Sequence, residues 1–185
     1  MRLHTTYLLA GLLAIVLGGC GDDGATSTAA PAQGGWPGVT IRVRDYAFDD
    51  VPRTITAGTR IAITNTSANE AHELTAFRLP DNEARDFREL QALEPEELGA
   101  LLPGAPALAL FAAPKAKGQL VLGDGLLHEP GRYVLVCFIP IGAKPDDVLT
   151  AIKKAAANPD SGPPQIDGGP PHVTAGMIAE IRVVP

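Results

Sequence analysis

Cysteine, methionine and histidine are scarce in this chain. Its 185 residues include two cysteines, two methionines and four histidines, and its net charge is −6. An acidic chain lacks the basic surface on which nucleic-acid binders rely, so we expect no nucleic-acid partner. A hydrophobic content of 45% excludes a disordered chain, and the length suits one domain of ordinary size. Because potential metal ligands are so few, the position of each one is informative.

Several motifs of enzymes are also missing from the sequence. We find no Gly-rich phosphate loop, no paired-cysteine motif and no nucleophile elbow. A cysteine nucleophile assisted by His72 or His172 is the least favoured alternative, because no third residue that would orient the histidine can be named. We therefore expect a protein that is not an enzyme.

Residues 1–19 have the features of an export signal. Arg2 and His4 precede an apolar run over residues 7–17, which is closer in length to a signal-peptide core than to a membrane span. The sequence Leu-Gly-Gly-Cys that ends at Cys20 resembles the bacterial lipobox, whose cysteine is lipidated and becomes the mature N-terminus. A short uncleaved anchor is the alternative. We expect lipidation of Cys20 and an extracytoplasmic protein, anchored by lipid at the periplasmic face or the cell surface.

The remainder divides into a tether and a domain. Residues 20–38 contain the lipidated cysteine and a small, polar stretch that is typical of a flexible linker. The folded domain is expected over residues 39–185. It contains no second hydrophobic run of eighteen or more residues, so we expect this domain to be soluble.

Short segments that alternate apolar and polar residues dominate the domain. Each is typical of a strand with one face on a hydrophobic core. The expected strands cover residues 39–44, 54–56, 60–65, 73–79, 119–122, 133–138 and 178–184. Residues 81–102 and 145–155 have instead the composition of helices. We therefore predict an all-β fold, a β-sandwich with two helical insertions.

Cys137 stands at the end of an expected strand and has no intrachain partner if Cys20 is acylated. Most unpaired cysteines of this kind are small core hydrophobes, and that interpretation stays open. A thiol in an oxidising compartment is exposed to oxidation, however, and a bound metal would protect it.

Histidine and methionine support the metal hypothesis. His172 and Met177 are separated by four residues directly before the last strand, and His72 opens a strand after a loop. Two histidines, one cysteine and one methionine form the ligand set of a blue-copper site, whereas magnesium and calcium prefer oxygen. His128 lies in a turn and is expected to be solvated.

Four segments resemble those of plastocyanin-like cupredoxins, a family of blue copper proteins, and occur in the same order. They are the early strands with their turn (46–59), the loop to the first His (65–72), the Pro-Gly-x-Tyr strand that ends at the Cys (130–137) and the closing His-x4-Met (172–177).

This resemblance implies a Greek-key β-sandwich with one mononuclear type 1 copper ion bound by His72, Cys137, His172 and Met177. It further implies electron transfer to or from a redox partner protein or an oxidase at the membrane. In the family the second histidine lies nearest the surface and offers the electron path, so His172 is expected there.

The chain departs from the family in one respect. Between Cys137 and His172 lie 34 residues, where the family usually has one short loop. Loop closure costs only about 0.6 kcal/mol per doubling of length, so the insertion does not forbid the site. It leaves two alternatives open, a Cu(I) chaperone or store and a metal-free interaction module. A separation above about 10 Å between Cys137 and His172 would exclude a shared metal.

Overall fold

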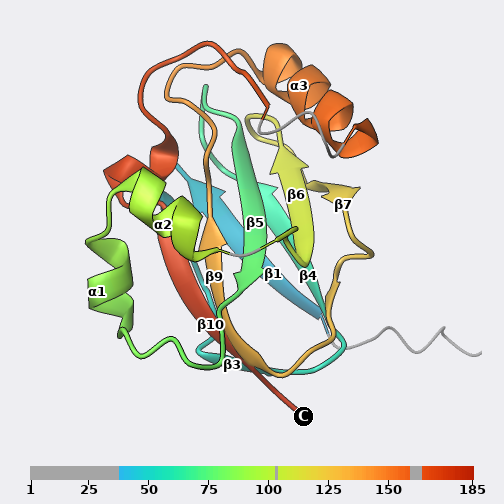
Figure 1. Cartoon of the computed structure of the whole chain (residues 1–185). Helices are drawn as coiled ribbons and strands as arrows, with labels where there is room; N and C mark the ends of the chain where they lie inside the picture. Colours follow the sequence, from blue (N-terminus) through green and yellow to red (C-terminus); the bar gives the residue numbers. More distant parts are fainter. Residues whose placement is uncertain (1–37, 103, 159–163) are drawn as a thin grey trace, which may run out of the picture. The chain divides into compact units, whose positions relative to one another are not determined.

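The computed structural model describes residues 38–102, 104–158 and 164–185 (Figure 1). They all belong to one compact unit, Gly34–Pro185. The expected signal peptide (1–19), the lipidation site Cys20 and most of the tether lie outside the described residues. No helix in the described part of the chain is both long and apolar enough to cross a membrane.

Two β-sheets form the described domain. The smaller sheet has the strand order β2-β1-β4-β8 and the larger one has β3-β10-β9-β5-β6-β7. The strands of the smaller sheet are β1 (Gly38–Arg44), β2 (Ala47–Asp49), β4 (Thr59–Asn65) and β8 (Leu126–Leu127). Those of the larger sheet are β3 (Thr54–Thr56), β5 (His72–Arg78), β6 (Leu108–Ala112), β7 (Gln119–Leu122), β9 (Gly131–Val136) and β10 (Ile178–Val184).

The main hydrophobic core lies between the two sheets. Along β4, Ile61 and Ile63 are buried and alternate with polar or half-buried neighbours. They pack in one cluster with Leu74 of β5 and Leu135 of β9, which belong to the other sheet. The predicted β-sandwich is confirmed, and the alternation arises because one face of each strand meets this core.

The larger sheet is covered on its outer face as well. Helices α1 (Phe87–Gln91) and α2 (Pro95–Leu101) lie beside β9 and β10 (Figure 1). Leu90 and Leu98 of these helices pack with Val134 and Val136 of β9 in a second hydrophobic cluster. Residues 133, 135 and 137 of this segment therefore face the space between the sheets, whereas 134 and 136 face the helices.

Several elements differ from the sequence-based expectation. The alternating pattern predicted neither β6 nor β8, because β6 is buried at every residue and β8 has two residues. β2 lies in the segment 46–59, which resembles the early strands of the family. The helical stretch 81–102 forms two short helices, the first capped by Asp86 and the second begun by Pro95. The second insertion forms α3 (Pro145–Ala157), which begins at the expected residue.

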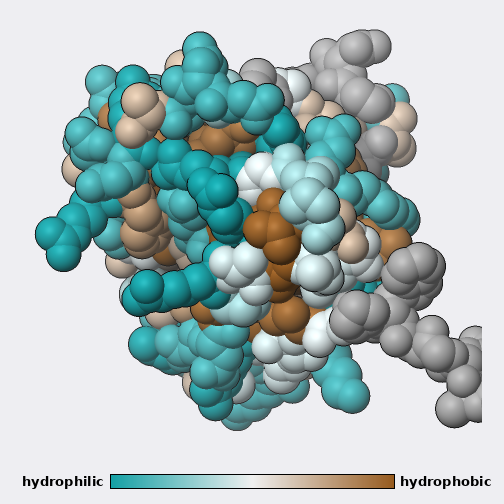
Figure 2. All heavy atoms as spheres, turned by 90° about the horizontal axis from the view of Figure 1, so that it is seen from below, coloured by the Kyte–Doolittle hydropathy of each residue, from teal (hydrophilic) through white to brown (hydrophobic). Residues whose placement is uncertain are grey.

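One face of the domain is mainly polar. Seen from below, it shows hydrophilic residues around a narrow hydrophobic strip (Figure 2). Leu120, which is 44% exposed to solvent, is the one exposed large hydrophobic side chain in the described ranges.

Candidate metal centre

Three of the predicted ligands meet at one end of the sandwich, uppermost in Figure 1. β5 and β9 are antiparallel neighbours, so the start of β5 and the end of β9 lie at the same edge of the sheet. His72 is the first residue of β5, and Cys137 directly follows β9. His172 opens the short 3-10 helix η2 (His172–Ala175), which leads into β10. The donor atoms of the three side chains all lie within 4.8 Å of one another.

The spacing of these donors suits a single metal ion. Cys137 Sγ lies 3.3 Å from His172 Nδ1, and the Nδ1 atoms of His72 and His172 are 3.1 Å apart. Metal–nitrogen bonds are about 2.0 Å and metal–sulfur bonds about 2.3 Å long, so both separations are short enough for one metal ion to bind both donors of each pair. All three residues are completely buried, so the donors face a site shielded from solvent.

Met177 is held beside this cluster by the backbone. The Cys137 amide donates to the Met177 carbonyl (3.3 Å), and the Met177 amide donates to the His172 carbonyl (3.2 Å). Met177 is completely buried and belongs to the same core cluster as Cys137. Gly176 makes the turn between His172 and Met177 at φ 97°, a conformation that favours glycine. The buried set of two histidines, one cysteine and one methionine is typical of a type 1 copper site.

The long insertion does not separate Cys137 from His172, because its two ends pair with each other. Four backbone hydrogen bonds form a stem between residues 137–141 and residues 169–173. They run from Val173 N to Cys137 O (2.9 Å), His172 N to Ile139 O (2.9 Å), Ile141 N to Pro170 O (3.0 Å) and Gly169 N to Ile141 O (2.9 Å). The stem fixes the base of the loop, so the number of residues beyond it has little influence on the donors.

The resemblance implied that His172 is the ligand nearest the surface, and the loops of the structure cover it. Its ring has no solvent exposure, and neither has that of His72. Tyr46, in the turn between β1 and β2, packs edge-on against the His172 ring with 5.3 Å between the centroids. The Glu70 carboxylate covers the same ring, with Oε2 3.4 Å from Nε2. The loops around the site therefore enclose the second histidine.

Burial also determines the protonation of the donors. It lowers the pKa of His72 to about 4, assisted by the neighbouring His172, and lowers the pKa of His172 as well. Burial raises the pKa of the Cys137 thiol well above its ordinary value, and the charge of Glu73 raises it further. Without a cation, the imidazoles are neutral and the thiol keeps its proton at neutral pH. Metal binding must displace that proton.

Comparisons with known proteins give a weak structural likeness. No family model and no curated protein matches the chain. Among solved structures, the chain is similar to the dithionite-reduced auracyanin of Roseiflexus castenholzii, with a TM-score of 0.43, 17% identity and coverage of 82% of this chain and 100% of that one. It is also similar to auracyanin B, with a TM-score of 0.40, 16% identity and coverage of 80% of this chain and 89% of that one. For auracyanin A, a "blue" copper protein from Chloroflexus aurantiacus, the TM-score is 0.41, the identity 16% and the coverage 80% of this chain and 99% of that one. The properties of the site follow from its own side chains and not from this similarity.

Most side chains around the ligands were not singled out from the sequence, although Asn65 begins the segment 65–72 that resembles the loop to the first histidine. Asn65 organises the loop before His72: its amide donates to the carbonyls of Glu70 (2.8 Å) and Ala112 (3.1 Å), and its oxygen accepts from the Ser67 amide (2.8 Å). Ser67 Oγ in turn lies 2.8 Å from His72 Nε2. Glu70 is the one charged residue between Asn65 and His72, and this was the available signal.

Glu73 supports the cysteine from the neighbouring strand. Its amide donates to Cys137 Sγ (3.4 Å), and its carboxylate accepts from the Phe138 amide (2.8 Å). Burial raises the pKa of Glu73 to about 7. The amide contact places the partial positive charge of the N–H beside the sulfur, which favours a thiolate.

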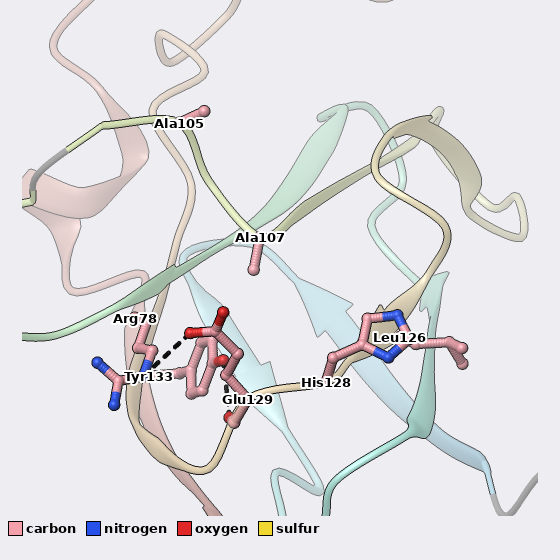
Figure 3. A pocket seen from close by; sticks show the side chains of 7 residues that line it. All are labelled: Arg78, Ala105, Ala107, Leu126, His128, Glu129 and Tyr133. Atoms are coloured by element: carbon pink, nitrogen blue, oxygen red, sulfur yellow. Dashed lines mark hydrogen bonds and ion pairs between the residues drawn. The ribbon is translucent and has the colours of Figure 1, made fainter.

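His128 lies outside the cluster. It precedes β9, whose opposite end leads to Cys137, and it borders a pocket of about 310 Å³. Figure 3 shows its ring turned away from Tyr133 and Glu129. The ring is 60% exposed and lies 2.7 Å from a carboxylate oxygen of Asp124. His128 is therefore a solvated turn residue in the structure.

Proposed function

We propose that this protein is a one-electron carrier with a single type 1 copper ion. The Cys137 thiolate, His72 and His172 would bind the metal, and the Met177 thioether would be a weaker fourth ligand. The observation that carries the proposal is the convergence of three buried sulfur and nitrogen donors within 4.8 Å. Copper, when bound, supplies the reversible one-electron couple.

The chain contributes a rigid and dry site. His72 and Cys137 are fixed by paired strands of one sheet, and His172 is fixed by the stem of the insertion. Because the donors are buried and tied to the backbone, their positions change little between the two charge states of the metal. A small rearrangement is what rapid electron transfer requires.

The same features favour a carrier over a copper chaperone or store. A protein that hands on its metal needs donors that a recipient can reach, whereas His72, Cys137 and His172 have no exposed surface. Opening the insertion would require the hydrogen bonds of its stem to break. Both features support retention of the metal.

The proposed partners follow from the N-terminal sequence. We infer a lipid anchor at Cys20 that holds the domain at the extracytoplasmic face of the membrane. A redox partner protein or an oxidase in the same membrane would exchange electrons with it. This location and these partners rest on the lipobox-like sequence that ends at Cys20.

Titration of the detergent-purified full chain with Cu(II) tests the copper assignment. We expect one equivalent to bind and to give an intense visible charge-transfer band from thiolate to copper. Zn(II) is the control, because its filled d shell gives no such band at the same site. Tight Cu(I) binding without the Cu(II) band would instead identify a chaperone or store, and no copper binding would identify a metal-free module.

The anchor is tested by a matched pair of cysteine variants. In a bacterial host, we expect the wild type and Cys137→Ser to incorporate labelled fatty acid and to sediment with membranes. Cys20→Ser should incorporate none, because the acceptor thiol is lost. Labelling that persists in Cys20→Ser, or a wild-type chain in the soluble fraction, would contradict the anchor.

A further inference from the structure

Four polar groups form a continuous chain through the centre of the site. Ser67 Oγ lies 2.8 Å from His72 Nε2, and His72 Nδ1 lies 3.1 Å from His172 Nδ1. His172 Nε2 lies 3.4 Å from an oxygen of Glu70. Since neither ring is exposed to water, the hydrogen-bond partner of each ring nitrogen must be one of these four polar groups or Cys137.

The polar groups at the two ends of this series, Ser67 and Glu70, differ in whether they can donate a hydrogen bond. A serine hydroxyl either donates or accepts a hydrogen bond, whereas an ionised carboxylate only accepts. His172 Nε2 has no hydrogen bond of good geometry within the described residues, and Glu70 is the acceptor beside it. A slight turn of that side chain closes the contact, provided that Nε2 carries the proton.

We propose that Glu70 is a positioning residue that holds His172 in the tautomer with a proton on Nε2. The lone pair of His172 Nδ1 then faces His72 and Cys137 before any metal arrives. In the metal-free protein we expect His72 to carry its proton on Nδ1, where it can donate to His172, and Ser67 to donate to His72 Nε2.

The two histidines consequently play different parts when a metal binds. His172 keeps its proton on Nε2. His72 loses its proton from Nδ1 and gains one on Nε2, so its charge is unchanged, and the Ser67 hydroxyl rotates from donor to acceptor. The Cys137 thiol releases one proton to solvent, which is the net proton release of the site.

The surroundings of Glu70 explain why it can hold this position. Its carboxylate Oε2 also accepts from the Gly142 amide (3.2 Å) on the long insertion, and its carbonyl accepts from Asn65 (2.8 Å). The side chain is only 19% exposed. Glu70 therefore joins the loop before the first histidine to the insertion before the second.

A second carboxylate provides a natural control. Asp45 Oδ1 lies 3.6 Å from His72 Nε2, which is close to the corresponding distance for Glu70 and His172. Asp45 is 55% exposed, and the nitrogen that it faces is already paired with Ser67. Its charge is more exposed to water than that of Glu70, so we expect it to influence the neighbouring imidazole less.

The tautomers can be read in the metal-free full chain from histidine nitrogen–proton correlation NMR near neutral pH. We expect His172 to carry its proton on Nε2 in the wild type and in Asp45→Asn. Glu70→Gln should keep this tautomer, because its amide oxygen still accepts, whereas Glu70→Ala should populate the other. A proton on Nδ1 of His172 in the wild type, or a wild-type spectrum in Glu70→Ala, would overturn the assignment.

The consequence for redox chemistry rests on the proposed function. A shielded negative charge beside a ligand stabilises Cu(II) over Cu(I), so Glu70→Gln should change the ratio of the two affinities about tenfold in favour of Cu(I). For a one-electron couple this is a rise in potential of about 59 mV. Asp45→Asn should shift the potential less.

The two readouts separate the possible failures. A wild-type potential in Glu70→Gln would overturn the tuning by Glu70 while leaving the copper site in place. A wild-type chain that binds no copper would overturn the proposed function and the tuning with it, but the NMR result would stand. If Glu70→Ala does not fold, the wild-type tautomer and the potential of Glu70→Gln still decide.

Discussion

Replacing Cys137 with serine should abolish the visible charge-transfer band of the copper-loaded protein while the β-sandwich remains folded. A serine hydroxyl is a hard ligand that does not ionise at neutral pH, so it cannot replace the soft thiolate. The change in size is small, and the Glu73 amide that donates to Cys137 Sγ can donate to a hydroxyl instead. Absorption after Cu(II) addition and far-ultraviolet circular dichroism measure the two effects.

The matched control is His128→Ala, which removes an exposed imidazole outside the cluster. We expect its band and its copper stoichiometry to equal those of the wild type. A band that survives in Cys137→Ser, or that disappears in His128→Ala, would place the copper elsewhere on the chain.

Shortening Leu135 to alanine should lower the free energy of unfolding by about 2–5 kcal/mol. Leu135 lies in β9, opposite Ala76 of β5 and Ala179 of β10, and is 1% exposed. Both facing residues are small, so they cannot fill the space that the leucine leaves. Denaturant unfolding followed by circular dichroism gives the change.

Leu120→Ala provides the comparison on a strand at the edge of the same sheet. Its side chain is 44% exposed, so we expect a change of no more than about 0.5 kcal/mol. A loss in Leu135→Ala that is as small as the one expected for Leu120→Ala would contradict this role of the packing around β9. Because Cys137 directly follows β9, the loss in Leu135→Ala should also weaken copper binding.

The sandwich could be predicted from the sequence wherever a strand buries only one face. β1 and β4 alternate clearly, whereas β6 is covered on both sides and reads as a plain apolar run. The helical stretch 81–102 could be recognised by composition, but its division depends on the caps at Asp86 and Pro95. Alternation therefore reports one-sided burial and not strands in general.

The candidate ligands could be named because cysteine, histidine and methionine are rare in this chain and have distinctive chemistry. Ser67 and Glu70 are residues of common types, and only the folded loop brings them to the imidazole rings. The burial of His172 depends on Tyr46, which is remote in sequence. The stem consists of hydrogen bonds between backbone groups, which the pattern of side chains in the sequence does not predict.

The paired ends of the insertion separate two quantities that are easily confused, the number of residues between two ligands and the distance between them. Ile141 and Gly169 are joined by a backbone hydrogen bond, although 27 residues lie between them in the chain. A search pattern that demands a short interval from cysteine to histidine would pass over this protein. A pattern that asks for two short extended segments, one leaving the cysteine and one approaching the histidine, would include it whatever the length between them.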